Sequence, residues 1–424
     1  MGFVEHNWAG NVAYRAARFH EPTSVVEVQS VVAAATKVRA VGSRHSFNTI
    51  ADTDGDQVSL ATMSRVVEID TSARTVMVDG GIGYAELAGY LDQHGMALAN
   101  LASLPHISVA GACATATHGS GVANGNLATA VRALQLVTAG GDVVEISRED
   151  DPDLMDAATV GLGAFGIVTR MTLTIEPTFD VRQTVYEHLP LPTALEWFTE
   201  IMADGYSVSL FTTWRHDDIE QLWRKVRVAP GVGDEDGFDA GAVRYEARAA
   251  NRKLHPIAEL SAQPCTEQMG IAGPWHERLP HFRMGFTPSS GDELQSELFV
   301  AADDAPDAIR ILRGLGHQLT PVLKISELRT VAADTLWLSP CHGRRCVAFH
   351  FTWVPSWPRV RPVLARLESA LAPLAPVPHW GKLSTIAGHE LQLRFARLGA
   401  FSELVGRWDP DGKFRNAFLD AVLG

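Results

Sequence analysis

Apolar and polar residues follow helix-like and strand-like spacings along the chain, and the character of this pattern changes near residue 177. In the first part, short strand-like patterns alternate with helical ones. Thr23 and Ser24 place hydroxyls directly before an apolar run from Val25, which is typical of a helix start. A further helix is predicted over residues 84–94, closed by a glycine. Strands are predicted at residues 38–41, 57–60, 66–70, 75–80, 131–138 and 143–147.

After residue 177 the strand patterns are longer and alternate strictly, which predicts a largely antiparallel sheet with helices on one side. The region 229–242, rich in Gly and Asp, is predicted to be a loop. Helices are predicted at residues 192–204, 304–318 and 358–372. Strands are predicted at residues 179–189, 206–214, 222–228, 282–287, 294–301, 321–331 and 346–354.

At 424 residues the chain is too long for one ordinary core. Hydrophobic residues make up 46% and charged residues 20%, which is typical of a globular protein. The two patterns predict an α+β protein with one domain over residues 1–178 and a mainly antiparallel second domain over 179–377. Residues 378–424 are too few for a domain, and we expect them to pack on an earlier one.

The formal net charge is −13, without a run of like charges, which disfavours nucleic acid and anionic membranes as partners. No stretch approaches the roughly 18 apolar residues of a membrane span, and the first eight residues carry no signal-peptide pattern. Four cysteines in so long a chain indicate reduced thiols in the cytoplasm. Cys341, His342 and Cys346 match no zinc spacing, so no metal is expected.

One segment, Arg39-Ala-Val-Gly-Ser-Arg-His-Ser-Phe-Asn48, changes from an apolar strand to a polar turn at Gly42. Glycine permits backbone geometries and close approaches that other residues resist. Successive backbone N–H groups and hydroxyls in such a turn form a concavity that suits phosphate oxygens. His45 would then stand beside whatever carries the phosphate. An ordinary strand-to-loop turn is the alternative interpretation of this segment alone.

A second stretch of this kind spans residues 101–121, where small residues dominate from Ser108 to Gly121. They let the backbone approach a ligand closely, and the hydroxyls of Thr115 and Thr117 add hydrogen-bonding groups. A tightly packed helix of small residues is the alternative interpretation.

A third segment, Gly161-Leu-Gly-Ala-Phe-Gly166, spells the dinucleotide motif G-x-G-x-x-G. That motif must follow a strand and open a helix. Here it follows a helical pattern and opens an alternating strand from Ile167, so a nicotinamide site of the Rossmann type is rejected. Close backbone approach to a different cofactor is still allowed.

Polar side chains share one face on each of three predicted strands, because residues i and i+2 point the same way. The pairs are Glu327 with Arg329, His350 with Thr352, and Gln295 with Glu297. Polyols present adjacent hydroxyls that both donate and accept, so such a face suits a sugar site. A solvated outer face of the sheet is the alternative interpretation.

Three of these segments resemble the FAD-binding half of the vanillyl-alcohol oxidase family. They are Gly42-Ser-Arg-His-Ser-Phe-Asn48, Ser108-Val-Ala-Gly111 with Thr117-His-Gly-Ser-Gly121, and Gly161-Leu-Gly-Ala-Phe-Gly-Ile167. The resemblance extends over essentially the whole chain and is closer still to the alditol oxidases and sugar-lactone oxidases of that family. It implies a two-domain FAD-binding fold, with FAD on residues 1–178 and the substrate on the cap formed by 179–377. Residues 378–424 would return to the flavin site.

The resemblance also implies which residues hold the cofactor. In this family a histidine at the place of His45 often carries the flavin covalently through its C8α methyl, and a purely structural histidine is the alternative. The implied FAD contacts are Val41, Gly42, Ser43, Arg44, His45, Ser46, Ser103, Ser108, Gly111, Ala112, Cys113, Ala114, Thr117, His118, Gly121, Gly163, Gly166, Ile167, Lys382 and Asn416.

For the substrate, the resemblance implies oxidation of the terminal alcohol of polyols such as xylitol or sorbitol, with hydride transfer to flavin N5 and O2 reduced to H2O2. Arg329 and Lys382 would favour the developing alkoxide, while Glu327 and His350 would orient hydroxyls and one of them would take the proton. Ala102 resembles the small residue that leaves oxygen a route to the flavin. The implied substrate-binding residues are Ser103, Gln295, Glu327, Arg329, His350, Thr352 and Lys382.

Several alternatives stay open. An aldonolactone oxidase or dehydrogenase would share the fold, the flavin and most of these residues. The segment Lys324–Ser326 departs from the alditol oxidase pattern, which leaves the preferred substrate open. A non-catalytic flavin-binding or sugar-binding protein is a further class, and a metal-dependent hydrolase is the weakest, since no H-E-x-x-H motif is present. A monomer is expected, although no sequence feature reports the oligomeric state.

Overall fold

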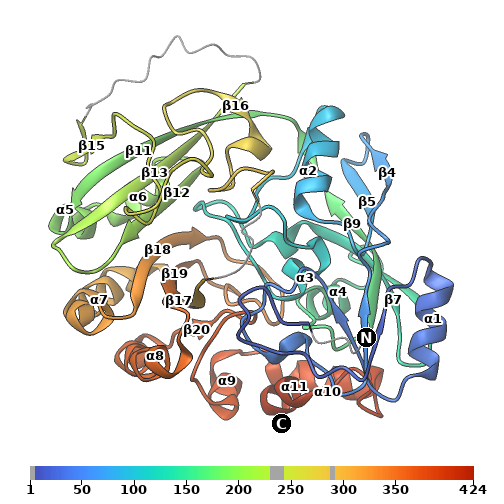
Figure 1. Ribbon diagram of the computed structural model, residues 1–424. Coiled ribbons are helices and arrows are strands. Elements are labelled where there is room, and N and C mark those ends of the chain that lie inside the picture. The colour runs from blue at the N-terminus through green and yellow to red at the C-terminus, as the bar shows by residue number, and fades with distance from the viewer. Residues whose placement is uncertain (1–4, 230–242, 287–291) are drawn as a thin grey trace.

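The computed structural model describes residues 5–229, 243–286 and 292–424. Most of the loop predicted at 229–242 and the last residue of the strand predicted at 282–287 lie outside the described residues. Two structural halves face each other in Figure 1, and the chain returns from the second to the first at its C-terminal end. None of the helices in the described ranges has the length and apolar content that a bilayer span requires.

The first half contains a small parallel sheet and a larger antiparallel sheet. The parallel sheet has the order β1 (Arg18–His20), β3 (Asp56–Ser59) and β2 (Val38–Val41). The antiparallel sheet has the order β4 (Val66–Asp70), β5 (Thr75–Asp79), β9 (Ile167–Thr174), β7 (Val131–Val137) and β8 (Val143–Ser147). A short pair, β6 (Met96–Ala97) and β10 (Glu176–Pro177), lies beside them.

The first helix, α1, begins where the sequence predicts a helix start. The hydroxyl of Ser24 accepts a hydrogen bond from the backbone N–H of Glu27 at the start of α1. The motif Gly161–Gly166 lies between a helix and a strand, which confirms that it is not a Rossmann turn. The helical elements are α1 (Val25–Ala34), η1 (Thr49–Ala51), α2 (Tyr84–Gln93), α3 (Val109–Ala114), η2 (Leu127–Ala130) and α4 (Pro152–Thr159).

The second half is built on one large sheet of ten strands, and its strand pairs are antiparallel as predicted. Its order is β14 (Val243–Arg244), β15 (Ala247–Ala249), β11 (Asp180–Pro190), β13 (Asp218–Val228), β12 (Ser207–Thr212), β18 (Leu323–Val331), β19 (Cys346–Trp353), β17 (Leu294–Ala301) and β20 (Val377–Pro378), with β16 (Gly273–Pro274) paired to β11.

Helices cover one face of this sheet, as the sequence predicts (Figure 1). Leu328 and Phe349 point to that face and pack on apolar residues of the two long helices, such as Ile309 and Leu364. The opposite face carries the polar side chains. The helical elements of this half are α5 (Leu191–Glu196), α6 (Phe198–Ala203), η3 (Trp275–Glu277), η4 (Ala302–Asp304), α7 (Ala305–Leu319), α8 (Trp357–Leu371) and η5 (Ala372–Leu374).

The strand predicted over residues 282–287 is wrong for its described part, which is irregular. Phe286 donates its backbone N–H to the carbonyl of Arg283, which closes a turn. The rings of Phe282 and Phe286 lie 5.7 Å apart, a contact between residues four apart that an extended strand does not allow. The apolar residues of this segment therefore follow a turn and not a sheet.

The C-terminal helices return to the first half (Figure 1). They are α9 (Gly388–Arg394), α10 (Leu398–Trp408) and α11 (Ala417–Leu423), and their apolar residues belong to the core of the first half. The side-chain amide of Asn416 donates to the backbone carbonyls of Thr49, Ile50 and Asp52. This return fastens the last segment beneath the loop that follows β2.

The Arg39 side chain, on β2, forms hydrogen bonds with three segments that are far apart in the sequence. Its guanidinium donates to the backbone carbonyls of Ile50, of Leu162 and Gly163, and of Phe414. Burial lowers the pKa of Arg39 to about 10, so the side chain remains charged at neutral pH.

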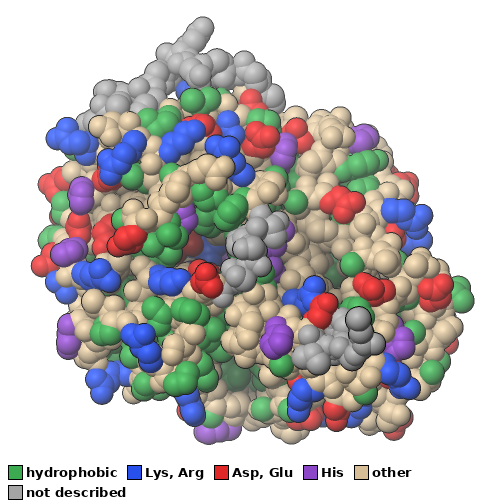
Figure 2. Space-filling view, viewed as in Figure 1, with side chains coloured by type: hydrophobic (Ala, Val, Ile, Leu, Met, Phe, Trp, Pro, Cys, Tyr) green, Lys and Arg blue, Asp and Glu red, His purple; other side chains and the backbone are tan. Residues whose placement is uncertain are grey.

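On the surface, positive and negative side chains are interspersed over the face shown in Figure 2.

We expect Arg39→Met to lower the free energy of unfolding by about 3–5 kcal/mol, because it leaves the carbonyl oxygens of Leu162, Gly163 and Phe414 without their donor. Urea unfolding followed by circular dichroism measures this. Arg310→Met is the matched control: Arg310 pairs with Asp307 on an exposed helix surface, and its loss should change stability by less than about 0.5 kcal/mol. Equal effects of the two substitutions would contradict the role given to Arg39.

Candidate active site

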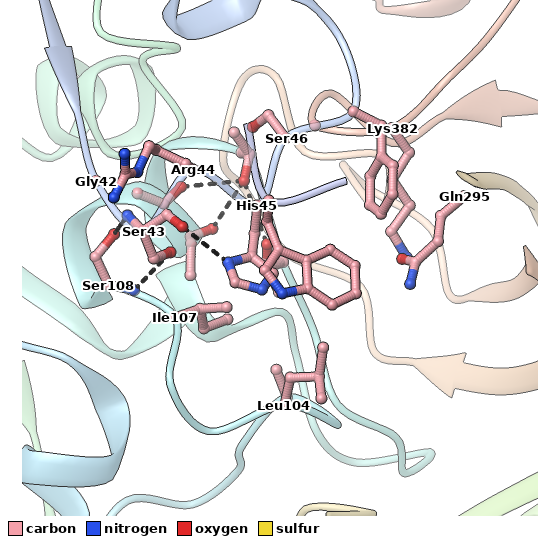
Figure 3. A pocket seen from close by; sticks show the side chains of 18 of the residues that line it. Gly42, Ser43, Arg44, His45, Ser46, Leu104, Ile107, Ser108, Gln295 and Lys382 are labelled. Carbon is pink, nitrogen blue, oxygen red and sulfur yellow. Dashed lines mark hydrogen bonds between the residues drawn. The ribbon is translucent and has the colours of Figure 1, made fainter. Parts of the chain in front are cut away.

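A cavity of about 790 Å³ lies between the first half and the polar face of the large sheet. Its lining comes from both halves and from the segment after β20. Figure 3 shows the turn Gly42–Ser46 on one side of this cavity and Gln295 and Lys382 on the other. Segments that are far apart in the sequence therefore line the same cavity.

The turn after β2 forms a narrow cradle with the start of α3. Ser43 and Ser108 bond reciprocally: the Ser108 N–H donates to Ser43 Oγ at 3.2 Å, and the Ser43 N–H donates to Ser108 Oγ at 3.4 Å (Figure 3). A Cβ placed on Gly42 or on Gly111 would collide with Ser108 Oγ. Glycine at both positions therefore leaves room for the Ser108 hydroxyl in this cradle.

His45 is held in one orientation by three neighbours. Its Nδ1–H donates to the Ser43 carbonyl at 3.0 Å (Figure 3), and Trp8 stacks on the ring at a centroid distance of 4.9 Å. Burial lowers the pKa of His45 to about 3, so the ring is neutral and Nε2 carries a lone pair. His106 Nε2 lies 2.7 Å from that atom and must therefore donate the proton between them.

The first half of the lining fits a dinucleotide cofactor. Among the described residues, the carboxylates that line the cavity are those of Asp292, Glu293, Glu297 and Glu327, all in the second half. The lining from residues 8–168 contains small residues, hydroxyls, histidines and arginines instead. Such a surface accepts the phosphates and flat ring of FAD, since no described carboxylate there would repel the phosphates.

The polar end of the cavity is a row of side chains across β18, β19 and β17. Glu327 lies opposite His350, and His350 lies opposite Glu297. Gln295 lies opposite Thr352 one step along the same face. Exposed fractions of 4% for Glu327 and 8% for His350 rule out the solvated outer face.

Glu297 is the most highly coordinated of these side chains. Its carboxylate forms ion pairs with Arg329 Nη2 at 2.8 Å and Lys382 Nζ at 2.8 Å, and His118 Nε2 lies 3.2 Å away. Burial alone would raise the pKa of Glu297, but Lys382, His118 and Arg329 hold it well below its usual range. The carboxylate is therefore charged and fixes the two cations beside the cavity.

Glu327 is also held as a carboxylate. Arg329 Nε lies 3.5 Å from Glu327 Oε1, and His281 Nε2 lies 2.7 Å from the same oxygen. Burial raises the pKa of Glu327, but Arg329 and His281 bring it well below its usual range. His350, by contrast, is neutral because burial lowers its pKa to about 3, and its ring bonds to none of the described side chains.

The structure brings most of the predicted site residues to the cavity. All seven predicted substrate-binding residues line it. Lys382 reaches it because Asn48 Nδ2, just after the His45 turn, donates to the carbonyls of Trp380 and Lys382. The predicted cofactor contacts that line it are Val41, Gly42, Ser43, Arg44, His45, Ser46, Ser103, Ser108, Gly111, Ala112, Ala114, Thr117, His118, Gly163, Gly166 and Lys382.

Four predicted cofactor contacts do not line the cavity. Cys113 is fully buried and contacts the hydroxyl of Tyr84. Ile167 packs in the core under β2, and a Cβ on Gly121 would meet Asn124 and the Tyr206 backbone. Asn416 uses its amide to anchor the C-terminal helix. These four support the segments around the site.

Sequence reasoning missed several residues that the fold brings to the site. Glu297 lies on the predicted polar face beside Gln295 but is not among the predicted site residues. Trp8, His106 and His281 also line the cavity. For Glu297 the signal is present in its i+2 spacing from Gln295. For the others no local pattern exists, because their contacts join distant loops.

Comparison with known proteins agrees with this geometry. The profile described as FAD binding domain matches residues 16–147, and the profile described as D-arabinono-1,4-lactone oxidase matches residues 294–422. Alditol oxidase from Streptomyces sp. is 47% identical over 426 residues, covering 100% of both chains. L-gulono-1,4-lactone dehydrogenase from Mycobacterium tuberculosis is 30% identical over 449 residues, again covering 100% of both.

A solved structure of glucooligosaccharide oxidase from Acremonium strictum has the same fold, with a TM-score of 0.74 at 14% identity over 98% of this chain and 93% of that one. The fold and the cavity thus define an FAD-dependent oxidoreductase. The chain belongs to the FAD-linked oxidases of the vanillyl-alcohol oxidase type, in the branch that contains alditol oxidase.

The buried histidines predict acid sensitivity. The pKa is lowered by burial to about 3 in His45 and His350 and to about 4 in His281, and it is lowered in His118 and His379 as well. Between pH 6.5 and about 5 the unfolded chain takes up protons that the folded chain does not. The contribution of these histidines to the free energy of unfolding should therefore be full above pH 6.5 and fall as the pH drops, by about 1.4 kcal/mol per pH unit for each histidine.

Urea unfolding at several pH values tests this, with His379→Gln as the comparison. In the variant, the free energy of unfolding should change less steeply with pH, by the contribution of one histidine, whatever its absolute stability. Glu297 and Glu327 add no slope in this window, because their lowered pKa values affect stability only below about pH 4.5. A flat profile from pH 6.5 to 5 would contradict the neutral state of these rings.

Proposed function

We propose that this chain is an alditol oxidase that uses FAD to oxidise the terminal primary alcohol of polyols such as xylitol and sorbitol. The observation that carries the proposal is the buried row Glu327–His350–Glu297, which faces a cavity whose other end is the Ser43–His45 cradle. The full-length relative with 47% identity is an alditol oxidase, which supports the same substrate class.

The polar row can bind a chain of hydroxyls. Glu327 accepts hydrogen bonds, whereas Arg329 and Lys382 donate them. The amide of Gln295 and the hydroxyl of Thr352 do both. Gln295 donates to Glu293 at 2.6 Å, which leaves its carbonyl oxygen for a substrate hydroxyl. Adjacent hydroxyls of a polyol need such alternating partners.

When bound, FAD supplies the hydride acceptor at N5 and passes the electrons to O2, which yields H2O2. Arg329 and Lys382 stabilise the negative charge that develops on the substrate oxygen. We assign the proton of that hydroxyl to a ring nitrogen of His350, which is neutral and bonds to none of the described side chains. Glu327 orients the hydroxyls instead, because its partners hold it charged.

We also propose that FAD is attached covalently through His45. The neutral ring in the cradle would provide a nucleophilic nitrogen for the C8α carbon of the flavin. One N–H and one C8α–H bond would break as the N–C bond forms, and O2 would take up the two electrons and two protons as H2O2. The glucooligosaccharide oxidase of the same fold carries a 6-S-cysteinyl, 8α-N1-histidyl FAD, which supports a histidyl bond. The four cysteines of this chain are buried free thiols, which supports the proposed cytoplasmic location.

The second candidate function is oxidation of a sugar-1,4-lactone. The profile match to D-arabinono-1,4-lactone oxidase over residues 294–422 favours it. Ala102 lines the cavity and supports oxygen as the acceptor. Xylitol and L-gulono-1,4-lactone, each added anaerobically to separate samples, distinguish the candidates by which one bleaches the flavin. Peroxide formation in air then distinguishes an oxidase from a dehydrogenase.

The covalent bond predicts that yellow colour stays with acid-precipitated protein. The proposed oxidation predicts that xylitol, added anaerobically before precipitation, bleaches this colour. In His45→Ala the colour should pass to the supernatant, because the nucleophilic ring is gone. His94→Ala, on the exposed end of α2, should behave as the unaltered protein. Colour that leaves the unaltered protein on acid treatment would refute the covalent bond and leave FAD binding intact.

Arg329→Ala should lower kcat for xylitol by roughly 100-fold or more, because it removes a preorganised positive charge from the site. Flavin content per chain should stay near that of the unaltered protein. Arg359→Ala on α8 is the control, since Arg359 donates to the Pro321 carbonyl on the outer side of the sheet. An unchanged kcat in Arg329→Ala would exclude the electrostatic role.

A further inference from the structure

A buried lysine on the same face of the large sheet as Glu327 has no carboxylate partner among the described residues. Lys225 projects from β13 and is 1% exposed. Its Nζ donates to the backbone carbonyls of Leu279 and Pro280 and lies 3.3 Å from His281 Nδ1. The three protons of the ammonium therefore have three acceptors, all on one short loop.

These contacts determine the tautomer of His281. An ammonium group has no lone pair, so the imidazole nitrogen facing Lys225 must be the acceptor. In the neutral ring the proton then lies on Nε2, which is 2.7 Å from Glu327 Oε1. His281 is thereby a fixed hydrogen-bond donor to the carboxylate of Glu327.

The loop that carries His281 is also held from other sides. The backbone N–H of His281 donates to the carbonyl of Ser103 at 3.2 Å, and the Thr266 hydroxyl donates to Pro280 O at 2.9 Å. The His281 ring lies between Phe211 and Trp223, at centroid distances of 5.5 and 5.2 Å. The ring therefore has little freedom to turn away from Glu327.

We propose that Lys225 and His281 are positioning residues of the substrate site, in which the Lys225 ammonium fixes His281 as the donor that keeps Glu327 charged and aimed at substrate hydroxyls. This inference rests on the proposed polyol oxidation. Neither residue needs to touch the reacting carbon. Lys225 acts on the loop and the tautomer, His281 acts on Glu327, and Glu327 meets the substrate.

A purely structural role does not explain this choice of residues. An enclosed ammonium is costly, and an apolar side chain of similar volume is often neutral or stabilising at such a position. Burial lowers the pKa of Lys225 to about 7, which reflects that cost. The charged and titratable groups around this pair are Glu327, Arg329, His350, Cys265 and Arg283.

The first test compares two substitutions of His281. His281→Leu removes the donor to Glu327, and KM for xylitol should rise roughly tenfold while kcat falls much less. His281→Gln carries both a donor and an acceptor on its amide and should recover most of the lost affinity. An equal rise of KM in both variants, or a rise in neither, would overturn the positioning role.

The second test is the pH dependence of kcat/KM in Lys225→Met. Burial is the main reason that the pKa of His281 is lowered to about 4, and the Lys225 cation lowers it further, so removal of that cation should raise the pKa. The acid limb of the kcat/KM profile should therefore move to higher pH in the variant. Lys253→Met is the control, because Lys253 pairs with Glu267 away from the cavity.

Flavin content and melting temperature show whether Lys225→Met is folded, and the His281 pair remains informative if it is not. A pH profile of folded Lys225→Met identical to that of the unaltered protein would overturn the inference. If the unaltered protein oxidises no polyol, the proposed function fails instead. The two failures are therefore distinguishable.

Discussion

A buried carboxylate must be paired with positive charges or hydrogen-bond donors, and among the carboxylates of this site Glu297 has the most such partners. It is 1% exposed, and its partners come from three parts of the chain. His118 belongs to the first half, Arg329 to strand β18 on the far side of β19, and Lys382 to the segment after β20. Only when these parts meet is the charge compensated. The same contacts that satisfy Glu297 therefore close the cavity and set its geometry.

The large sheet makes this arrangement possible because alternate residues face opposite sides. Leu328 and Phe349 cover the side on which the helices pack, while Glu327 and His350 occupy the side toward the first half. Strand register then places side chains from separate strands within contact distance. The sheet holds the polar groups rigidly. The small residues of the first half allow its backbone to lie close to a cofactor.

The sequence predicted those features that depend on local spacing. The strand faces bearing Glu327 and His350 and the turn at Gly42 follow from patterns within a few residues. The strand at 282–287 was wrong because apolar residues alone do not distinguish a turn from an extended segment. Lys225 and His281 were missed because their contact joins residues 56 positions apart, through a loop with no periodic pattern. The domain boundaries and the roles of individual site residues stay predictions.

The electrostatic arrangement explains why the site can stabilise a negative charge without moving. Arg329 is shared between Glu297 and Glu327, and its Nη1 also donates to Ser103 Oγ at 3.2 Å. Arg329 and Lys382 pair with the two carboxylates, while the buried imidazoles of His281 and His350 remain neutral. In the proposed reaction, a substrate oxygen that gains charge would meet donors already oriented by fixed partners, so little reorganisation would be required. Because each partner is itself held, a change as remote as Lys225 acts on the same balance of charge.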